Sequence, residues 1–265
     1  MKVYDLFPFY NELDLLELRL AELDPVVDVF GLCELPVTFT DIPKPLYYRD
    51  NAIRFGHSKV NWWSPPAYPS GPHPTVDWFQ RRQLAKFIVD AEPDNVVILS
   101  DVDEIPDREI IKRYIEDGTE HPIVLGMSLF YHRVDLMDAS TWYGTLICRR
   151  KNLGVEPDME EFRKNRGNFP MVKGGWHFSW LGDGKAIADK LTAVDIEREN
   201  AIFGAHGIQA PPNDPEFLQS CYEDGKDLLR RGCDKKQVQV LPGVTHPHEI
   251  AAWLRKFPEY AKGAL

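Results

Sequence analysis

Residues 2–35, KVYDLFPFYNELDLLELRLAELDPVVDVFGLCEL, contain the pattern that decides the fold. Residues 2–7 are apolar and aromatic enough to predict a short strand. Residues 11–23 place leucines close to helical spacing, and residues 26–35 are apolar and rich in β-branched side chains, which predicts a second strand. Strand, helix and strand in this order predict an α/β fold with a mostly parallel central sheet flanked by helices.

The ends of these elements carry their own signals. We expect Pro8 to end the first strand and Pro25 to end the helix. Asn11 is the expected N-cap, because its side chain can accept a hydrogen bond from a free backbone N–H. Glu12 and Asp14 fall in the first turn, where the helix dipole favours carboxylates. These signals give the boundaries of a βαβ unit.

The rest of the chain indicates a single domain. Residues 61–74, NWWSPPAYPSGPHP, are rich in proline and predict a long loop. No stretch has the composition of a linker, so we expect one domain over residues 1–265 with a helical C-terminal portion. Further helices are predicted at 76–91, 107–117, 184–201, 215–231 and 247–262, and further strands at 95–100, 122–131 and 142–149.

The composition is that of a globular protein. Of 265 residues, 43 % are hydrophobic and 12 % aromatic, which excludes intrinsic disorder. The net charge of −10 argues against a general nucleic-acid binder, since such a protein needs a basic face. No apolar run approaches the roughly 18 residues that span a bilayer, and no signal peptide is recognised, so a cytoplasmic location is expected. The cysteines are scattered and are expected to be reduced thiols: Cys33, Cys148, Cys221 and Cys233.

An acidic triplet follows the most apolar strand. Residues 95–100, NVVILS, predict a buried strand, and Asp101, Asp103 and Glu104 come directly after it. Ligands of open α/β sheets bind at the carboxyl ends of strands, and neighbouring carboxylates repel one another unless a cation neutralises them. Asp101 and Asp103 share one side of an extended segment, so they predict a shared Mn²⁺ or Mg²⁺. The alternative is a strand-to-helix turn in which Asp103 or Asp107 caps the next helix.

Three other kinds of metal or phosphate site are excluded by the residues near the triplet. An EF-hand needs an oxygen ligand and a glycine where Ile105 and Pro106 stand. A phosphatase of the haloacid-dehalogenase type needs a small pair such as Gly-Thr after its two aspartates, where this chain has Glu104 and Ile105. The sequence has neither GxxxxGK[ST] nor a GxGxxG that follows a strand, so P-loop and Rossmann sites are not indicated.

Several segments between residues 2 and 191, taken in order, resemble glycosyltransferase family 17. Their combination is more specific than any one of them. The segments are VYDLFPFYNELDLLELR at 3–19, Glu34 with Thr38-Phe39 and Pro43-Lys44-Pro45-Leu46, Gln80-Arg81, SDVDEIP at 100–106, Phe162-Arg163, GWHFSW at 175–180, and Lys190-Leu191.

The resemblance implies a GT-A-like fold and a nucleotide-sugar donor, a UDP-sugar in the characterised branch. The sugar would pass with inversion to a glycan or another hydroxyl-bearing acceptor. Asp101 and Asp103 would hold the divalent cation against the donor diphosphate, where it neutralises the leaving group. His177 is the expected third metal ligand, and the alternative is a core histidine packed beside Trp176 and Trp180.

The resemblance also implies donor contacts from several parts of the chain. Glu34 and Glu12 lie near the ends of predicted strands on the nucleotide side, and Trp176, which follows two glycines, would stack on a sugar ring. Arg163 is the member of a basic group at 149–173 that matches the family. The residues expected to bind the donor are Asn11, Glu12, Glu34, Arg81, Asp101, Arg163, Trp176 and Lys190.

An inverting transfer needs a general base within hydrogen-bond reach of the acceptor hydroxyl. Glu104 and Asp183 are the expected catalytic candidates and Asp195 is a further one, while Glu104 is alternatively a support for the metal ligands. On this interpretation the chain divides into a nucleotide-binding half at 1–100, a metal and acceptor half at 101–200, and a helical C-terminal extension at 201–265.

Two other functions would use the same residues. A metal-dependent phosphoester hydrolase would use the same carboxylates. A non-catalytic carbohydrate-binding module would stack sugars on the aromatic side chains around a structural cation. A modified nucleic-acid base also stays open as an acceptor, because Trp62, Trp63 and Tyr68 could stack on it. The function we expect is a metal-dependent inverting glycosyltransferase, with GlcNAc as a candidate sugar.

Overall fold

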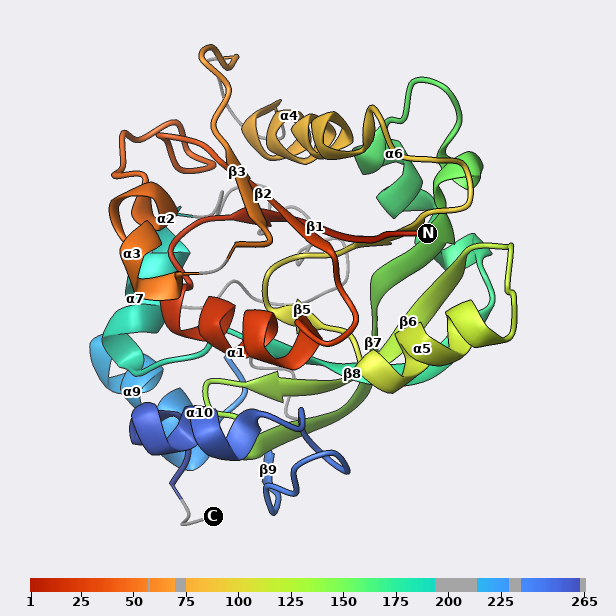
Figure 1. Ribbon diagram of the computed structural model, residues 1–265. Helices are drawn as coiled ribbons and strands as arrows, with labels where there is room; N and C mark the ends of the chain where they lie inside the picture. Colours follow the sequence, from red (N-terminus) through yellow and green to blue (C-terminus); the bar gives the residue numbers. More distant parts are fainter. Residues whose placement is uncertain (57, 70–74, 194–213, 229–234, 263–265) are drawn as a thin grey trace.

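The structure is a computed structural model that describes residues 1–56, 58–69, 75–193, 214–228 and 235–262. One mixed sheet organises this part of the chain, with its strands in the order β3-β2-β1-β4-β7-β6-β8-β5 and β9 beside β7 (Figure 1). The predicted α/β class is confirmed. The strands are β1 (Val3–Phe9), β2 (Val29–Glu34), β3 (Val60–Trp63), β4 (Val96–Leu99), β5 (Glu104–Ile105), β6 (Ile123–Tyr131), β7 (Leu136–Arg149), β8 (Met171–Ser179) and β9 (Lys236–Gln237).

The first four strands form a parallel half of the sheet, as the βαβ pattern predicts. β1 pairs in parallel with β2 and β4, and β2 pairs in parallel with β3. The expected stop at Pro8 is wrong, because β1 continues to Phe9 with Pro8 opposite Cys33. β4 pairs with β1 only as far as Leu6, so Pro8 has a strand partner on one side alone. A proline there resembles one in an edge strand, where the missing N–H is tolerated.

The other half of the sheet is mixed. β7 pairs antiparallel with β4 and β6, and β6 pairs in parallel with β8. β8 was not among the predicted strands, because its two glycines interrupt the apolar pattern. Gly175 has φ +87, and a Cβ there would lie 2.7 Å from the Ile105 carbonyl oxygen, so only glycine fits against β5. β5 pairs with β8 so that Glu104 lies opposite His177. The acidic triplet therefore bridges the two halves of the sheet.

Helices cover both faces of the sheet (Figure 1). On one face, α1 (Leu13–Leu23) and α5 (Arg108–Glu116) share a buried core with β1, β2 and β4. On the other face, the 3₁₀ helix η1 (Gln83–Ile88), which continues α4 (Thr75–Arg82), and α6 (Met159–Lys164) contribute to a second core. β1, β2 and β4 are thus buried on both sides, as their apolar runs predict.

Three predicted boundaries are corrected. α1 begins at Leu13, so Glu12 rather than Asn11 occupies the N-cap position, and its side chain makes no capping bond. The loop expected at 61–74 is shorter, because Val60–Trp63 pairs with β2, and residues 70–74 lie outside the described part. α5 begins one residue after Asp107, whose Oδ1 accepts the Glu109 N–H at 2.8 Å, so the capping alternative holds for Asp107.

The C-terminal portion is less helical than expected. α7 (Gly184–Ala193), α9 (Pro215–Asp224) and α10 (Ile250–Lys256) are present, but residues 235–249 hold only the short β9 and irregular backbone. The parts of the predicted helices at 194–201 and 229–231 lie outside the described residues. Shorter elements are α2 (Tyr47–Asp50), α3 (Ala52–Phe55), η2 (Arg150–Leu153), η3 (Asn165–Asn168) and η4 (Pro258–Tyr260). Cys33 and Cys148 are buried free thiols, and Cys221 is buried as well.

Candidate functional site

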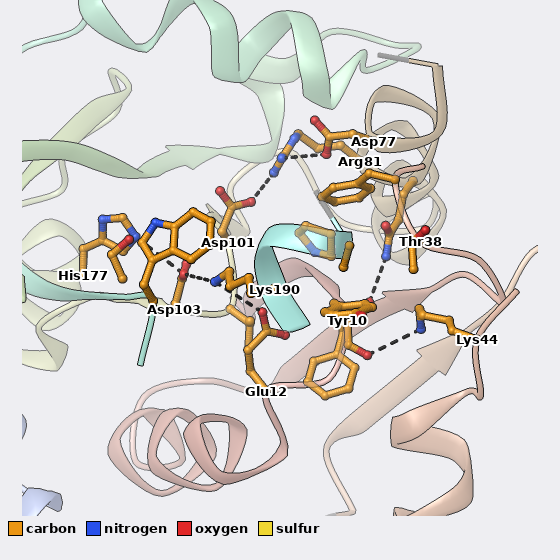
Figure 2. A pocket seen from close by; sticks show the side chains of 18 of the residues that line it. Tyr10, Glu12, Thr38, Lys44, Asp77, Arg81, Asp101, Asp103, His177 and Lys190 are labelled. Carbon is orange, nitrogen blue, oxygen red and sulfur yellow. Dashed lines mark hydrogen bonds and ion pairs between the residues drawn. The ribbon is translucent and has the colours of Figure 1, made fainter. Parts of the chain in front are cut away.

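A cavity of about 290 Å³ lies at the carboxyl ends of β1 and β4. Aromatic and aliphatic side chains form much of its wall, from the end of β1, the segment after β2, β7 and the segment after β8. The charged groups project into the same space from α4, α7 and the acidic triplet (Figure 2). Besides Tyr10, the charged and titratable residues of the wall are Glu12, Lys44, Asp77, Arg81, Asp101, Asp103, His177 and Lys190.

Asp101 lies between two arginines from different helices. Arg81 of α4 contacts its Oδ1 at 2.5 Å, and Arg163 of α6 contacts its Oδ2. Burial raises the pKa of Asp101, but the charges of Arg163 and Arg81 outweigh burial and hold that pKa well below its usual range. Asp101 is therefore ionised, and a guanidinium already binds each of its oxygens.

Asp103 faces two weaker partners across the cavity wall. The Lys190 Nζ of α7 lies 3.4 Å from Asp103 Oδ2, and the His177 Nε2 of β8 lies 3.6 Å from the same oxygen (Figure 2). Burial raises the pKa of Asp103, but Lys190 and His177 outweigh burial and lower that pKa to about 2. These separations exceed those of close charge-assisted hydrogen bonds, so all three groups can turn toward a ligand.

Glu104 is bound by the protein on all sides. It is fully buried, its Oε1 accepts from Trp142 Nε1 at 2.6 Å and from Arg163 at 3.1 Å, and its Oε2 accepts the Asp101 N–H at 3.0 Å. It does not line the cavity. Of the two roles expected for Glu104, this geometry favours the support of Asp101 over proton transfer.

Arg19 holds the backbone of the acidic segment and was missed at the level of sequence. Its fully buried guanidinium donates to the carbonyls of Asp101 at 3.0 Å and Glu104 at 2.7 Å. The other side of the guanidinium binds Asp5 at 2.6 and 2.8 Å and the Ser100 hydroxyl at 2.6 Å. An arginine on the leucine-rich face of a helix is the signal that could have revealed it, since a buried charge requires partners.

Trp142 was also missed. Its ring lies 4.7 Å from that of His177, and its Nε1 binds Glu104, so it supports both the histidine and the buried carboxylate. His177 keeps one buried nitrogen, Nδ1, without a hydrogen-bond partner among the described residues. No signal in the sequence pointed to Trp142, because it occupies a long antiparallel strand that the apolar pattern predicted only from residue 142 onward.

The predicted metal ligands are only partly assembled. Across the described residues, no group of three or more His, Cys, Asp and Glu side chains is arranged to hold a metal ion. Both carboxylate oxygens of Asp101 are bound by arginines, so Asp101 does not fit the role of metal ligand that the sequence predicts for it. Asp103 and His177 do fit as a pair, because a carboxylate oxygen and an imidazole nitrogen face each other at the cavity wall and suit Mn²⁺.

Other predicted site residues lie in different surroundings. Trp176 is buried, donates from Nε1 to the Thr245 carbonyl at 2.8 Å and does not line the cavity, so this geometry does not support its predicted stacking on a sugar. Asp183 is exposed, accepts the Ala186 N–H at 2.9 Å at the start of α7 and lines neither this cavity nor the second one described below. Asp195 lies outside the described residues.

Glu34 acts behind the wall rather than on it. It is fully buried, accepts from Trp62 Nε1 at 3.1 Å, and lies 3.5 Å from the Lys44 Nζ. Burial raises the pKa of Glu34, and Lys44 opposes that rise. Burial also lowers the pKa of Lys44, with Glu34 opposing it. Lys44, which lines the cavity beside Tyr10, is thus the cation that Glu34 positions.

A second cavity of about 270 Å³ adjoins the first. Glu12, Asp103 and Lys190 line both cavities and form the wall between them. Asn11, which was expected to bind the donor, lines only this second cavity. The structure therefore brings Glu12, Arg81, Asp101, Asp103, His177 and Lys190 together in the wall of the first cavity and places Asn11 in the second.

Comparison with known families decides the identity. The profile of glycosyltransferase family 17 matches residues 1–191. The chain belongs to glycosyltransferase family 17. Among curated proteins, this family 17 chain is similar to the β-1,4-mannosyl-glycoprotein 4-β-N-acetylglucosaminyltransferases of Rattus norvegicus and Homo sapiens, each 24 % identical over 252 residues. These matches cover 81 % of the chain and 46 % of each relative, so the chain spans about half the length of the curated relatives that it matches.

Solved structures resemble the family 17 chain only distantly. A nucleotide-diphospho-sugar transferase described as putative, from Desulfovibrio desulfuricans G20, has a TM-score of 0.36 at 10 % identity and covers 78 % of this chain and 98 % of that one. TarS 1–349 of S. aureus has a TM-score of 0.39 at 12 % identity and covers 98 % of this chain and 80 % of that one. Within the described residues, no helix is both long and apolar enough to cross a membrane.

Proposed function

We propose that this chain is a metal-dependent, inverting glycosyltransferase that moves a sugar from a nucleotide-sugar donor to a hydroxyl acceptor. The names of the curated relatives make GlcNAc the candidate sugar and a mannosyl glycan the candidate acceptor. One observation carries the proposal. Asp103, flanked by Lys190 and His177, faces a cavity at the carboxyl ends of two parallel strands, which is where α/β sheets bind nucleotides.

The cavity offers separate surroundings for each part of such a donor. Tyr10, Phe39 and Trp180 supply flat apolar surface on which a nucleotide base or a sugar ring can pack. Lys190 supplies a positive charge to the diphosphate, because its contacts with Asp103 and Glu12, at 3.4 and 3.7 Å, are loose enough to be exchanged.

Asp103 and His177 would hold Mn²⁺ or Mg²⁺ beside the same diphosphate. When bound, the cation would neutralise the charge of the departing nucleoside diphosphate. The protein itself holds the side chains of this wall in place. Arg81 and Arg163 bind the Asp101 carboxylate, and Glu104 accepts the backbone N–H of Asp101. Trp142 packs against His177. Preorganised charge of this kind favours a transition state in which negative charge grows on the leaving group.

Thermal unfolding with and without UDP tests the proposal. We expect UDP to stabilise the wild type when Mn²⁺ is present, by about 2.7 kcal/mol at a hundredfold excess over its Kd, and to lose most of that effect when EDTA is added. The variant Asp103→Asn should fold but lose the shift. Asp117→Asn, an exposed aspartate at the end of α5, is the matched control and should keep it.

The products released by the purified wild-type protein distinguish a glycosyltransferase from a phosphoester hydrolase and from a carbohydrate-binding module. A transferase releases UDP from a nucleotide sugar, whereas a phosphoester hydrolase releases phosphate from UDP or from sugar phosphates. A binding module releases neither. Failure of UDP, GDP and other nucleotides to shift the unfolding temperature with Mn²⁺ or Mg²⁺ would contradict the proposal.

A further inference from the structure

The wall between the two cavities contains few carboxylates that can reach both sides. Among the described residues, those that line both cavities are Glu12, Asp103 and Lys190. Asp103 is paired with His177 and Lys190 on the donor side. Glu12 is joined to Lys190 (Figure 2), so of the two carboxylates of this wall it is the one outside the Asp103–His177 pair.

The charges of the two cavities differ in a way that suits two substrates. Four carboxylates line each cavity, but the first also has three cationic side chains, Lys44, Arg81 and Lys190, and the second has two, Arg54 and Lys190, so an anionic diphosphate is favoured less in the second. Its additional carboxylates, Asp14 and Asp189, can accept hydrogen bonds from hydroxyl groups. A neutral, hydroxyl-rich molecule such as a sugar fits these walls better than a nucleotide does.

Glu12 is held in a position that helix formation does not explain. It is the N-cap residue of α1, yet its side chain makes no capping bond. Its Oε2 accepts the backbone N–H of Asn11 at 3.0 Å, and its Oε1 lies 3.7 Å from the Lys190 Nζ. The side chain is 19 % exposed, so it is sheltered and can still be reached from a cavity.

The other carboxylates near the site are less suited to accept a proton. Both oxygens of Glu104 are bound by protein donors, and Asp183 lines neither cavity. Asp14 is bound by Arg54 and by the Tyr260 hydroxyl, which lies 3.0 Å from its Oδ2. Besides Asp103, the carboxylates on the described walls of the second cavity are Glu12, Asp14 and Asp189. Of these three, Glu12 has the longest ion-pair distance, 3.7 Å to Lys190 Nζ.

We propose that Glu12 is the general base of the transfer and that the acceptor hydroxyl reaches it in the second cavity, an inference that rests on the proposed function. The acceptor oxygen attacks the anomeric carbon as the bond from that carbon to the diphosphate oxygen breaks, and the bonding electron pair leaves with the nucleoside diphosphate. The hydroxyl proton passes to a Glu12 carboxylate oxygen and later to water. Lys190 lies between the two carboxylates, with its Nζ 3.7 Å from Glu12 Oε1 and 3.4 Å from Asp103 Oδ2, so Glu12 adjoins the donor side of the wall.

The test measures UDP release from UDP-GlcNAc with Mn²⁺, with water or azide as the nucleophile. Glu12→Gln keeps the size of the side chain and removes the base, so hydrolysis should fall by about 10²–10⁴-fold while the UDP-induced thermal shift is unchanged. Azide carries no proton to lose, so it should restore UDP release by the variant and yield the glycosyl azide of inverted configuration. Glu116→Gln, at the exposed end of α5 and lining neither cavity, should behave as the wild type.

The outcomes separate the two proposals. A wild type that neither binds UDP nor releases it from the donor overturns the proposed function, and the role of Glu12 with it. A wild type that is active, beside a Glu12→Gln variant that hydrolyses at a similar rate or is not rescued by azide, overturns the role of Glu12 alone. If Glu12→Gln does not fold, Glu12→Asp replaces it, with partial activity expected and wild-type activity contradicting the inference.

Discussion

Replacing Arg19 by methionine tests how the acidic segment is held. Methionine keeps an unbranched apolar side chain, two atoms shorter than that of arginine, and removes the guanidinium that lies 4.5 Å from the centre of the Phe7 ring. It removes every hydrogen bond to Asp5, to Ser100 and to the carbonyls of the acidic segment. Breaking a fully buried ion pair from one side costs about 3–5 kcal/mol, because the remaining charge is left uncompensated.

Urea unfolding followed by circular dichroism gives this free energy directly. A loss of 3–5 kcal/mol corresponds to a fall in Tm of about 6–20 °C for a domain of this size. Arg113→Met, on the exposed face of α5, is the control and should change the stability by less than about 0.5 kcal/mol. A loss below about 1 kcal/mol for Arg19→Met would refute the assignment of Arg19 as the anchor of this segment.

Two further results would sharpen the test. The double variant Asp5→Leu with Arg19→Met should be more stable than Arg19→Met alone, since an apolar pair can replace a buried ion pair. If the losses in free energy of unfolding of the two single variants simply add in the double variant, this reasoning is contradicted. Burial raises the pKa of Asp5, and Arg19 opposes that rise. Without Arg19 the Asp5 carboxyl group of the folded chain takes up a proton more readily. The difference in free energy of unfolding between the wild type and Arg19→Met should therefore become smaller as the pH falls from 8 to 5.

Three other predictions concern the surroundings of the site. Burial lowers the pKa of His132 to about 4. Between pH 6.5 and 4 this imidazole is therefore protonated in the unfolded chain and neutral in the folded chain. Stability to urea should fall by up to about 3 kcal/mol over that range, and His132→Asn, which tolerates the positive φ of this position, should remove this slope. Trp142→Phe leaves Glu104 Oε1 with one donor fewer and should cost about 1–3 kcal/mol in thermal unfolding, whereas no change would contradict its supporting role. Ala186→Trp narrows the second cavity, so transfer to methyl β-D-mannopyranoside should fall while the UDP thermal shift persists; equal loss of both would place the donor there instead.

The sequence was most informative where local pattern determines structure. The parallel half of the sheet follows from apolar strands and a leucine-rich helix between residues 3 and 34, and these elements lie where the pattern placed them. The acidic triplet follows β4 at the carboxyl edge of the sheet, as predicted, because the end of an apolar strand is visible in the sequence. Asp103, His177 and Lys190 meet there.

The parts that could not be predicted depend on contacts between distant segments. The pairing of Glu104 with His177 across β5 and β8 joins residues far apart in the chain, and no local period encodes it. The same holds for the two arginines that bind Asp101: a shared metal was inferred from the spacing of Asp101 and Asp103, whereas the fold supplies guanidinium groups to the first of them. The burial of Trp176 could not be predicted, because a tryptophan beside glycines has the same local sequence whether it faces a ligand or the core.

The most direct test of the central claim is the anomeric configuration of the product formed from UDP-GlcNAc, followed by proton NMR from the first minutes of the reaction with Mn²⁺. In UDP-GlcNAc the sugar is α-linked. We expect the first product to be the β anomer, and Asp103→Asn to form it at a greatly reduced rate. A first product in the α configuration, or a purified wild-type chain that binds UDP but releases none from any nucleotide sugar, would contradict the account.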